Sequence, residues 1–326
     1  MLKKVVASAP GKVILYGEHS VVYGEPAIAI ALSKRAYATV YPLSTSTIEI
    51  DAVNYGIRAE FPQERKITDL KRKKLKILQP IWEACLQVLE YTNTKQGLKL
   101  RIESEIPRGA GLGSSAAVAV STIMAVSTLL GAELPLQAIS KLAYEAEKIV
   151  HETPSGIDNT IATFGGGVLF KKGNITKINV KENIPLVIGD TGIERITKRL
   201  VLKVRSLKEK YDDIVTSIIK SIGLIIPKAL KALTEGDLLT LGELMNINQG
   251  LLDALGVSTR EISRLIYAAR IAGAYGAKLT GAGGGGCIIA LAPPEKQKVI
   301  AEAIEKEGGK SLITKISIRG VKIEEK

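Results

Sequence analysis

The 326-residue chain contains only two cysteines, Cys85 and Cys287, and only two histidines, His19 and His151. The cysteines lie far apart and neither belongs to a CxxC pair, and neither histidine has a partner at the spacing of metal ligands. These absences argue against a disulfide framework and against a structural zinc site. We therefore expect the protein to work in a reducing cytoplasm.

Long apolar runs are absent as well. Gly, Ser or Lys interrupts each hydrophobic stretch before it reaches the length that crosses a bilayer, so no membrane segment is expected. Residues 1–12 also lack the apolar core of a secretory signal. Hydrophobic residues nevertheless make up 46% of the chain. This share, together with the length, predicts large buried cores in two domains.

Aromatic residues are scarce, at 4%, whereas basic residues exceed acidic ones and give a net charge of +12. Binding of nucleic acid usually needs a basic stripe with aromatic stacking residues. The only dense basic run is residues 71–74, which we interpret as a solvated helix face or loop. The surplus charge indicates a lysine-rich surface, with attraction of anionic ligands such as nucleotides as the functional alternative. We expect no nucleic-acid partner.

Strand-like and helix-like segments mix along the chain, which predicts an α/β (α+β) fold. Residues 3–8 and 12–16 are expected to form a strand pair around a Pro10-Gly11 turn. Beyond about residue 185 long amphipathic helices dominate, so we place a boundary there, between domains 1–182 and 183–326. The predicted helices are 116–130, 135–150, 200–222, 227–235, 238–255 and 261–272. A capping box from Ser258 to Glu261 is expected to start the last of them.

The first of three glycine-containing segments runs from Pro10 to His19. Its Lys12 follows a Pro-Gly pair on a strand, where rigid backbone would hold the ammonium in place. Such a cation can stabilise an anion or lower the pKa of a nearby hydroxyl group. An ordinary hairpin with a surface lysine is the alternative.

The second segment, residues 107–115, is a glycine loop that opens a helix. Glycines let backbone approach a ligand closely, and the helix start offers N–H groups and the positive end of its dipole. We expect this loop to bind phosphate, with a serine hydroxyl able to ligate Mg²⁺. The alternative is that Ser114 or Ser115 simply caps the helix.

The third segment runs from Lys278 to Cys287 and formally contains G-x-G-x-x-G. A dinucleotide fingerprint requires a helix after it, but an apolar strand follows here, so we reject that interpretation. Close contact between this backbone and another loop or a phosphate is expected instead.

Two carboxylates, Glu147 and Asp158, flank a Pro-Ser-Gly turn. Phosphoryl transfer needs a metal ligand on one side and a carboxylate near the attacking hydroxyl on the other, and these two could divide those duties. An Asx cap for Asp158 and a solvated helix charge for Glu147 remain open alternatives.

Together and in this order, the three segments resemble the signature motifs of the GHMP superfamily of kinases: APGKxxLxGEH, PxGAGLGSSAA and KLTGAGGGG. Within the superfamily, two further stretches are similar to those of mevalonate kinases. They are residues 151–159, which resemble HGxPSGxDN, and residues 245–258, which contain MNINQGLL and LGVS. One departure is Glu152, which stands where the family usually has glycine.

The resemblance implies a role for individual residues. Asp158 would be the catalytic base, Lys12 the cation beside it, and Thr197 a further catalytic residue. Ser115 and Glu147 would hold Mg²⁺, and Gly283 to Gly285 would buttress the phosphate loop. The ATP phosphates would be bound by Pro107, Gly109, Ala110, Gly111, Leu112, Gly113, Ser114 and Ser115. The substrate would be bound by Glu18, His19, Ser155 and Asp158.

The resemblance also implies a ribosomal-S5-like N-terminal domain, a ferredoxin-like C-terminal domain, and transfer of the ATP γ-phosphate to the 5-hydroxyl of mevalonate. By analogy a homodimer is possible. Other GHMP kinases remain as alternatives: phosphomevalonate kinase, mevalonate 3-kinase and homoserine kinase. A non-catalytic metabolite sensor of this fold and a basic nucleic-acid-binding protein are further alternatives. Retention of Lys12, Glu147 and Asp158 together argues against the sensor.

Overall fold

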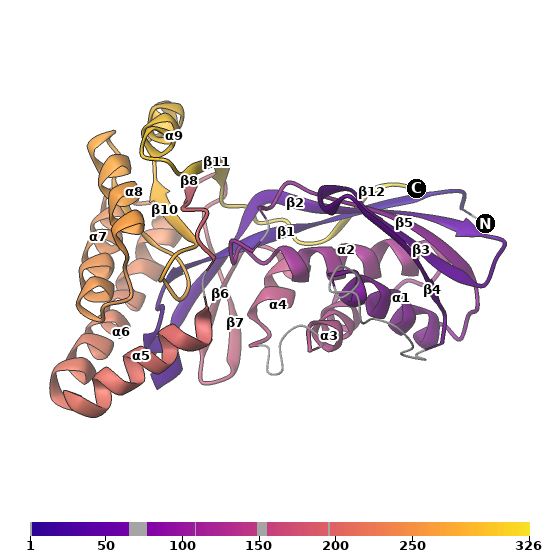
Figure 1. Ribbon diagram of the computed structural model, residues 1–326, viewed down its shortest axis with the longest axis horizontal. Helices are drawn as coiled ribbons and strands as arrows, with labels where there is room; N and C mark the ends of the chain where they lie inside the picture. The colour runs from indigo at the N-terminus through magenta and orange to yellow at the C-terminus, as the bar shows by residue number, and fades with distance from the viewer. Residues whose placement is uncertain (1, 65–76, 108, 149–154, 195) are drawn as a thin grey trace.

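The computed structural model describes residues 2–64, 77–107, 109–148, 155–194 and 196–326. The predictions for the basic run 71–74, for His151 and for Glu152 concern residues outside these ranges. Within them, the predicted mixture of helices and strands is confirmed. The molecule is elongated, with a larger sheet and its helices at one end and a smaller sheet with further helices at the other (Figure 1).

The larger sheet has the order β12-β1-β2-β5-β3-β4, with β6 added beside β2 and β7 beside β6. Its strands are β1 (Val5–Tyr16), β2 (Ala27–Leu43), β3 (Thr47–Ala52), β4 (Ile57–Pro62), β5 (Gly97–Ser104), β6 (Gly167–Lys171), β7 (Asn174–Ile178) and β12 (Lys322–Glu325). Because β12 pairs with β1, the C-terminal end of the chain returns to the sheet that the N-terminal end begins.

Four helices cover one face of this sheet (Figure 1). They are α1 (Gln79–Tyr91), α2 (Ser114–Leu129), α3 (Leu136–Glu147) and α4 (Ile157–Phe164). On β5 the predicted alternation is confirmed, because Leu98, Leu100 and Ile102 are buried while Lys99 and Arg101 are exposed. The buried set faces the helices and joins one continuous hydrophobic core.

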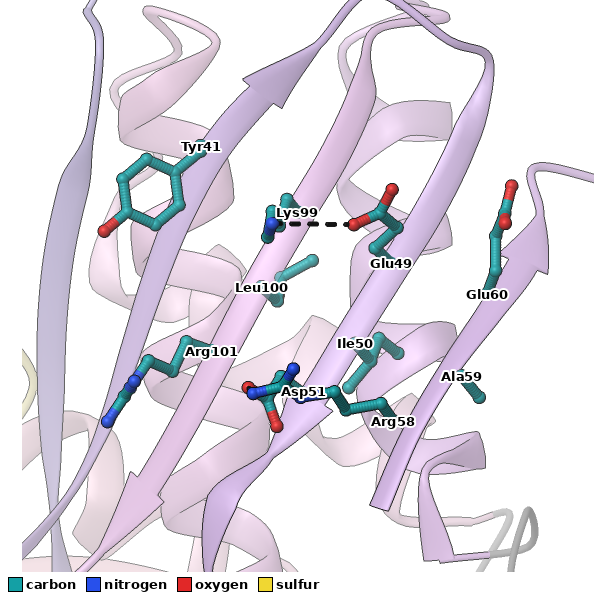
Figure 2. A pocket seen from close by; sticks show the side chains of 10 residues that line it. All are labelled: Tyr41, Glu49, Ile50, Asp51, Arg58, Ala59, Glu60, Lys99, Leu100 and Arg101. Atoms are coloured by element: carbon teal, nitrogen blue, oxygen red, sulfur yellow. Dashed lines mark ion pairs between the residues drawn. The ribbon is translucent and has the colours of Figure 1, made fainter. Parts of the chain in front are cut away.

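The opposite face of the larger sheet carries a hollow of about 660 Å³ over β2, β3, β4 and β5, with charged side chains among its lining residues (Figure 2). Its charged side chains are matched across neighbouring strands, as opposite charges on adjacent strands stabilise each other. Arg58 pairs with Asp51 at 2.9 Å, and Lys99 lies 3.9 Å from Glu49. This face is therefore a solvated surface with balanced charge.

The expected hairpin at Pro10-Gly11 is wrong: β1 continues through both residues as one strand. Pairing with β2 shifts register between Pro10 and Lys12, which marks a β-bulge. A proline cannot donate a ladder hydrogen bond, and bulges are where sheets tolerate it. The Pro-Gly pair thus marks an irregularity within a strand, and this irregularity positions Lys12.

The smaller sheet has the order β11-β8-β10-β9, and all its strands are antiparallel. They are β8 (Pro185–Asp190), β9 (Gly276–Leu279), β10 (Cys287–Leu291) and β11 (Lys310–Lys315). The helices that pack around it are α5 (Thr197–Lys210), α6 (Asp212–Glu235), α7 (Leu238–Ala254), α8 (Arg260–Ile271) and α9 (Gln297–Lys306). The first strand of this sheet begins just after the predicted boundary at residue 182, whereas β12 belongs to the other sheet; the division into 1–182 and 183–326 stays a prediction.

Three details of the predicted helices are wrong. The helix predicted over 200–222 is interrupted at Tyr211, between α5 and α6, and Pro227, predicted to begin a separate helix, lies inside α6. Buried Ile226 and Ala229 on either side of that proline anchor the helix to the core, and such packing outweighs local propensity. The predicted capping box is also absent: Thr259, not Ser258, caps α8 by accepting from the Ile262 N–H.

Within the described ranges, none of the helices combines the length and the apolar character that crossing a bilayer requires.

Candidate active site

Strand β1 brings the first glycine segment against the second. At the bulge, the Lys12 N–H donates to the Leu112 carbonyl at 2.8 Å. A Cβ on Gly11 would lie 2.9 Å from that same oxygen, and one on Gly113 would lie 2.8 Å from Cγ of Lys12. Because real Cβ atoms avoid such contacts, glycine at both positions is what allows the loop and the strand to meet.

The loop itself is built on left-handed backbone. Gly109, Gly111 and Gly113 have φ values of 68°, 73° and 73°. Gly113 is the N-cap of α2 and no side chain caps that helix, so the alternative in which a serine serves as the cap is not observed. Ser115 is exposed in the first turn, where helix N–H groups and the dipole favour an anion.

Of the other residues predicted to bind the phosphates, Pro107 and Ser114 are half-buried, and Ala110 and Leu112 are buried. The buried pair belongs to the main hydrophobic core. Their side chains therefore anchor the loop in the core, which leaves the backbone of the loop as the part available to a ligand.

The ammonium of Lys12 lies 3.2 Å from the Asp158 carboxylate, although the two residues are far apart in sequence. Asp158 occupies the first turn of α4, whose N-cap is Gly156 at φ 78°. The Asx-cap alternative is therefore not observed. The side chains remain 11% and 25% exposed, so the pair is enclosed but reachable from solvent.

Asn159, next to Asp158, points the other way. Its amide donates to both the backbone oxygen and the hydroxyl of Ser140, at 2.9 and 3.0 Å. Ser140 lies on α3, the helix that ends at Glu147. Asn159 therefore fixes the helix carrying Asp158 to the helix carrying Glu147. The sequence motif contained Asn159 but gave no hint of this partner.

Glu147 is 8% exposed, and its Oε2 has no hydrogen-bond partner among the described residues. Burial, followed by repulsion from Asp158, raises the pKa of this carboxyl to about 7, against the opposing influence of Lys12. The alternative of a solvated helix charge is not observed. A buried carboxylate lacking a partner beside a second carboxylate is the arrangement that a cation would stabilise.

The third glycine segment meets the first through alternate residues. Lys278 forms an ion pair with Glu18, the Thr280 hydroxyl donates to the Ile14 carbonyl at 2.8 Å, and the Ala282 carbonyl lies 2.8 Å from Nε2 of His19. Lys278 belongs to β9, whereas Ala282 lies beyond the strand and after Gly281, whose φ is 82°. The strand that follows, β10, confirms that this is not a dinucleotide-binding loop.

Two glycines of the third segment lie close to backbone outside the first segment. A Cβ on Gly283 would meet the Val257 carbonyl at 2.2 Å, and one on Gly285 would meet the Ile193 carbonyl at 2.7 Å. The loop is thus packed against the C-terminal half of the chain. Its predicted role as a buttress of the phosphate loop stays a prediction.

The remaining predicted site residues differ in accessibility. His19 is 5% exposed with a positive φ of 60°, and burial lowers its pKa. Ser155 is exposed and its hydroxyl accepts from the Ile157 N–H at 3.4 Å. Thr197 is exposed as the first residue of α5. Glu18 is fully buried, a position that its place in the motif did not indicate.

Two family models match separate parts of the chain. The GHMP kinases N-terminal domain family matches residues 79–167, and the GHMP kinases C-terminal family matches residues 229–310. A mevalonate kinase of Pyrococcus furiosus is 46% identical, with 99% of each chain covered. The Methanococcus jannaschii mevalonate kinase structure has a TM-score of 0.86 at 30% identity, covering 96% of this chain and 98% of that one. An L. major mevalonate kinase in complex with R-mevalonate has a TM-score of 0.84 at 28% identity, covering 98% and 97%.

Proposed function

The chain belongs to the mevalonate kinases of the GHMP family, and from this membership we infer that it transfers the γ-phosphoryl group of ATP to the 5-hydroxyl group of mevalonate. The observation that carries the proposal is the Lys12–Asp158 pair at 3.2 Å, placed on the strand whose backbone also holds the phosphate loop. Nucleophile activation and phosphate binding would thereby meet on one short stretch of β1.

We propose that Asp158 accepts the proton of the attacking hydroxyl and that Lys12 stabilises the oxygen as its negative charge develops. Phosphoryl transfer needs little covalent chemistry from the protein, so orientation and charge supply most of the rate. The ion pair also holds the Asp158 carboxylate beside the Lys12 ammonium, where both can face the attacking hydroxyl.

The phosphates of ATP would bind the backbone of residues 107–115 at the start of α2, with negative charge at the positive end of the helix dipole. Ser115 and Glu147 would hold Mg²⁺, for which the unpartnered Oε2 of Glu147 is the support. When bound there, Mg²⁺ neutralises charge on the phosphates. His19, Glu18, Ser155 and Thr197 are proposed on the substrate side of the site.

A coupled assay of ADP release tests the activity, with mevalonate, phosphomevalonate and homoserine compared as acceptors. We expect turnover with mevalonate and a phosphorylated 5-position in the NMR spectrum of the product. Phosphorylation at the 3-position, or preference for another acceptor, would assign the chain to a different GHMP reaction. A cytoplasmic setting and a homodimer are proposals that rest on composition and analogy, respectively.

A further inference from the structure

The Lys278–Glu18 ion pair lies entirely within the protein, with both side chains 0% exposed. Glu18 follows β1, and Lys278 belongs to β9 of the smaller sheet. The pair therefore joins the two sheets, which are separate in hydrogen bonding. Neither side chain is accessible to a substrate.

Further hydrogen bonds complete the pair. The ammonium of Lys278 also donates to the Leu279 carbonyl at 2.6 Å, and Oε2 of Glu18 accepts from the Asn248 amide at 3.1 Å. Both oxygens of Glu18 are thus engaged, one by each partner. Burying an ion pair is tolerable only when such additional bonds are present.

Two neighbours of Asn248 on α7 hold β9 itself. This strand is at the edge of the smaller sheet, so N–H groups on its outer side need partners. Asn246 accepts from the Ala277 N–H at 3.2 Å, and Gln249 accepts from the Leu279 N–H at 2.9 Å. These amides bracket Lys278 and leave it one orientation, toward Glu18.

The same network fixes His19. This residue directly follows Glu18, adopts a positive φ of 60°, and contacts the Ala282 carbonyl at 2.8 Å. A non-glycine residue holds such backbone only where its surroundings determine it. The neighbouring Glu18 is held by Lys278 and Asn248, and Nε2 of the ring contacts the Ala282 carbonyl. The imidazole therefore has little freedom to turn.

We propose that Lys278 and Asn248 are positioning residues that act through Glu18 to place His19 and the third glycine segment at the active site. This assigns a role to the MNINQ stretch, which the reaction itself does not use. The inference rests on the proposed substrate role of His19. Glu18 accordingly contributes to substrate binding by holding its neighbour, since both its oxygens are taken.

Stability alone does not account for the pair. Replacing a buried ion pair by apolar groups of similar volume is often neutral or stabilising, whereas breaking it by removing one partner is costly. A double substitution that removes both charges can therefore separate the two roles. With apolar side chains at both positions, it keeps the packing but removes the bonds that hold residue 18 in place.

The test compares Glu18→Met/Lys278→Met with the wild type and with Trp82→Phe. Trp82 is a suitable control because it is also buried, and its indole N–H on α1 donates to the Pro62 carbonyl at 2.8 Å, far from Glu18 in the fold. KM for mevalonate, KM for ATP and kcat are measured, together with the melting temperature. Since the chain has two histidines, the ring signals of His19 are assigned by NMR from their loss in His19→Gln.

We expect the double variant to fold and its KM for mevalonate to rise on the order of 10- to 100-fold, as a displaced binding group can cause. Its KM for ATP should stay near the wild-type value and the His19 signals should shift. Trp82→Phe, which loses the bond to Pro62, should lower the melting temperature without altering KM or the His19 signals. Asn248→Ala, which leaves both charges in place, should reproduce the KM and NMR effects in part and serves if the double variant does not fold.

Wild-type KM and unshifted His19 signals in a folded double variant, or in Asn248→Ala, would overturn the proposal. Failure of the proposed function is distinguishable, because the wild-type protein would then be inactive with mevalonate. In that case the His19 signals alone decide whether Lys278 and Asn248 position the ring.

Discussion

Two lysine–carboxylate pairs, Lys278–Glu18 and Lys12–Asp158, each have one member on β1 or in the turn after it. Both join an ammonium to a carboxylate, but they differ in burial and in their further hydrogen bonds. Lys278 and Glu18 are fully buried and Glu18 is bound by a third residue, Asn248. Lys12 and Asp158 are 3.2 Å apart but partly exposed, at 11% and 25%. The first pair has its hydrogen-bonding capacity filled by protein, and the second keeps capacity for a reacting group. Enclosure and further hydrogen bonds, rather than charge, distinguish the pair bound wholly by protein from the pair that is open to a ligand.

The largest expected effect is on the exposed pair. Asp158→Asn should lower kcat about 10²- to 10⁴-fold, because a general base contributes that much, and should leave the melting temperature nearly unchanged. Steady-state kinetics and thermal unfolding measure the two. Asp213→Asn is the matched control, an exposed aspartate in the first turn of α6. Near-normal kcat in Asp158→Asn would remove Asp158 from the role of base.

The buried pair should respond in the opposite way. Lys278→Met leaves the Glu18 carboxylate buried without its cation, and breaking such a pair costs about 3–5 kcal/mol of stability. Lys12→Met should cost far less, because solvent reaches its partner. Denaturant unfolding of the two variants measures the difference. Equal losses of stability in both would show that burial does not distinguish the pairs.

Glu147 adjoins the exposed pair, and its replacement should stabilise the protein while impairing catalysis. Its pKa is raised from 4.5 to about 7, so the folded protein retains a proton that the unfolded chain releases. Stability from this group is therefore present below pH 4.5, declines as pH rises toward 7, and stays low above it. Without metal at pH 8, Glu147→Gln should gain up to about 3 kcal/mol.

Thermal unfolding of Glu147→Gln in EDTA between pH 4 and pH 8 checks this dependence. Glu145→Gln is the control, because Glu145 lies on the same helix but is 43% exposed and pairs with Lys148. A gain that is the same at all pH values would contradict the assignment to this carboxyl.

The smallest expected effect concerns Ser115. Ser115→Ala should raise the Mg²⁺ concentration needed for half-maximal activity by roughly tenfold, which is the lower end of what loss of a group at a metal site costs. Titration of activity with Mg²⁺ at fixed ATP measures it. Ser217→Ala, at an exposed serine on α6, should leave the requirement unchanged; an unchanged requirement in Ser115→Ala would argue against the ligand role.

Local signals in the sequence were informative to different degrees. Alternation in residues 98–103 indicated a half-buried strand, and β5 has that pattern because one of its faces packs on helices. The Pro10-Gly11 pair indicated a turn, but pairing with neighbouring strands keeps the chain extended there. The pair corresponds instead to a bulge in β1. Pro227 was predicted to begin a separate helix over 227–235, but α6 runs through it because residues on both sides of the proline are buried.

The sequence by itself determined the mixed fold, the glycine loop that opens a helix and the motifs that indicate a GHMP kinase, because each depends on residues close together in the chain. Only the tertiary structure decided which distant groups meet. It paired Lys12 with Asp158, enclosed Glu147, and turned Glu18 inward to Lys278 and Asn248. Burial and hydrogen-bond partners depend on residues that are neighbours in space, and the spacing of residues along the chain does not reveal them.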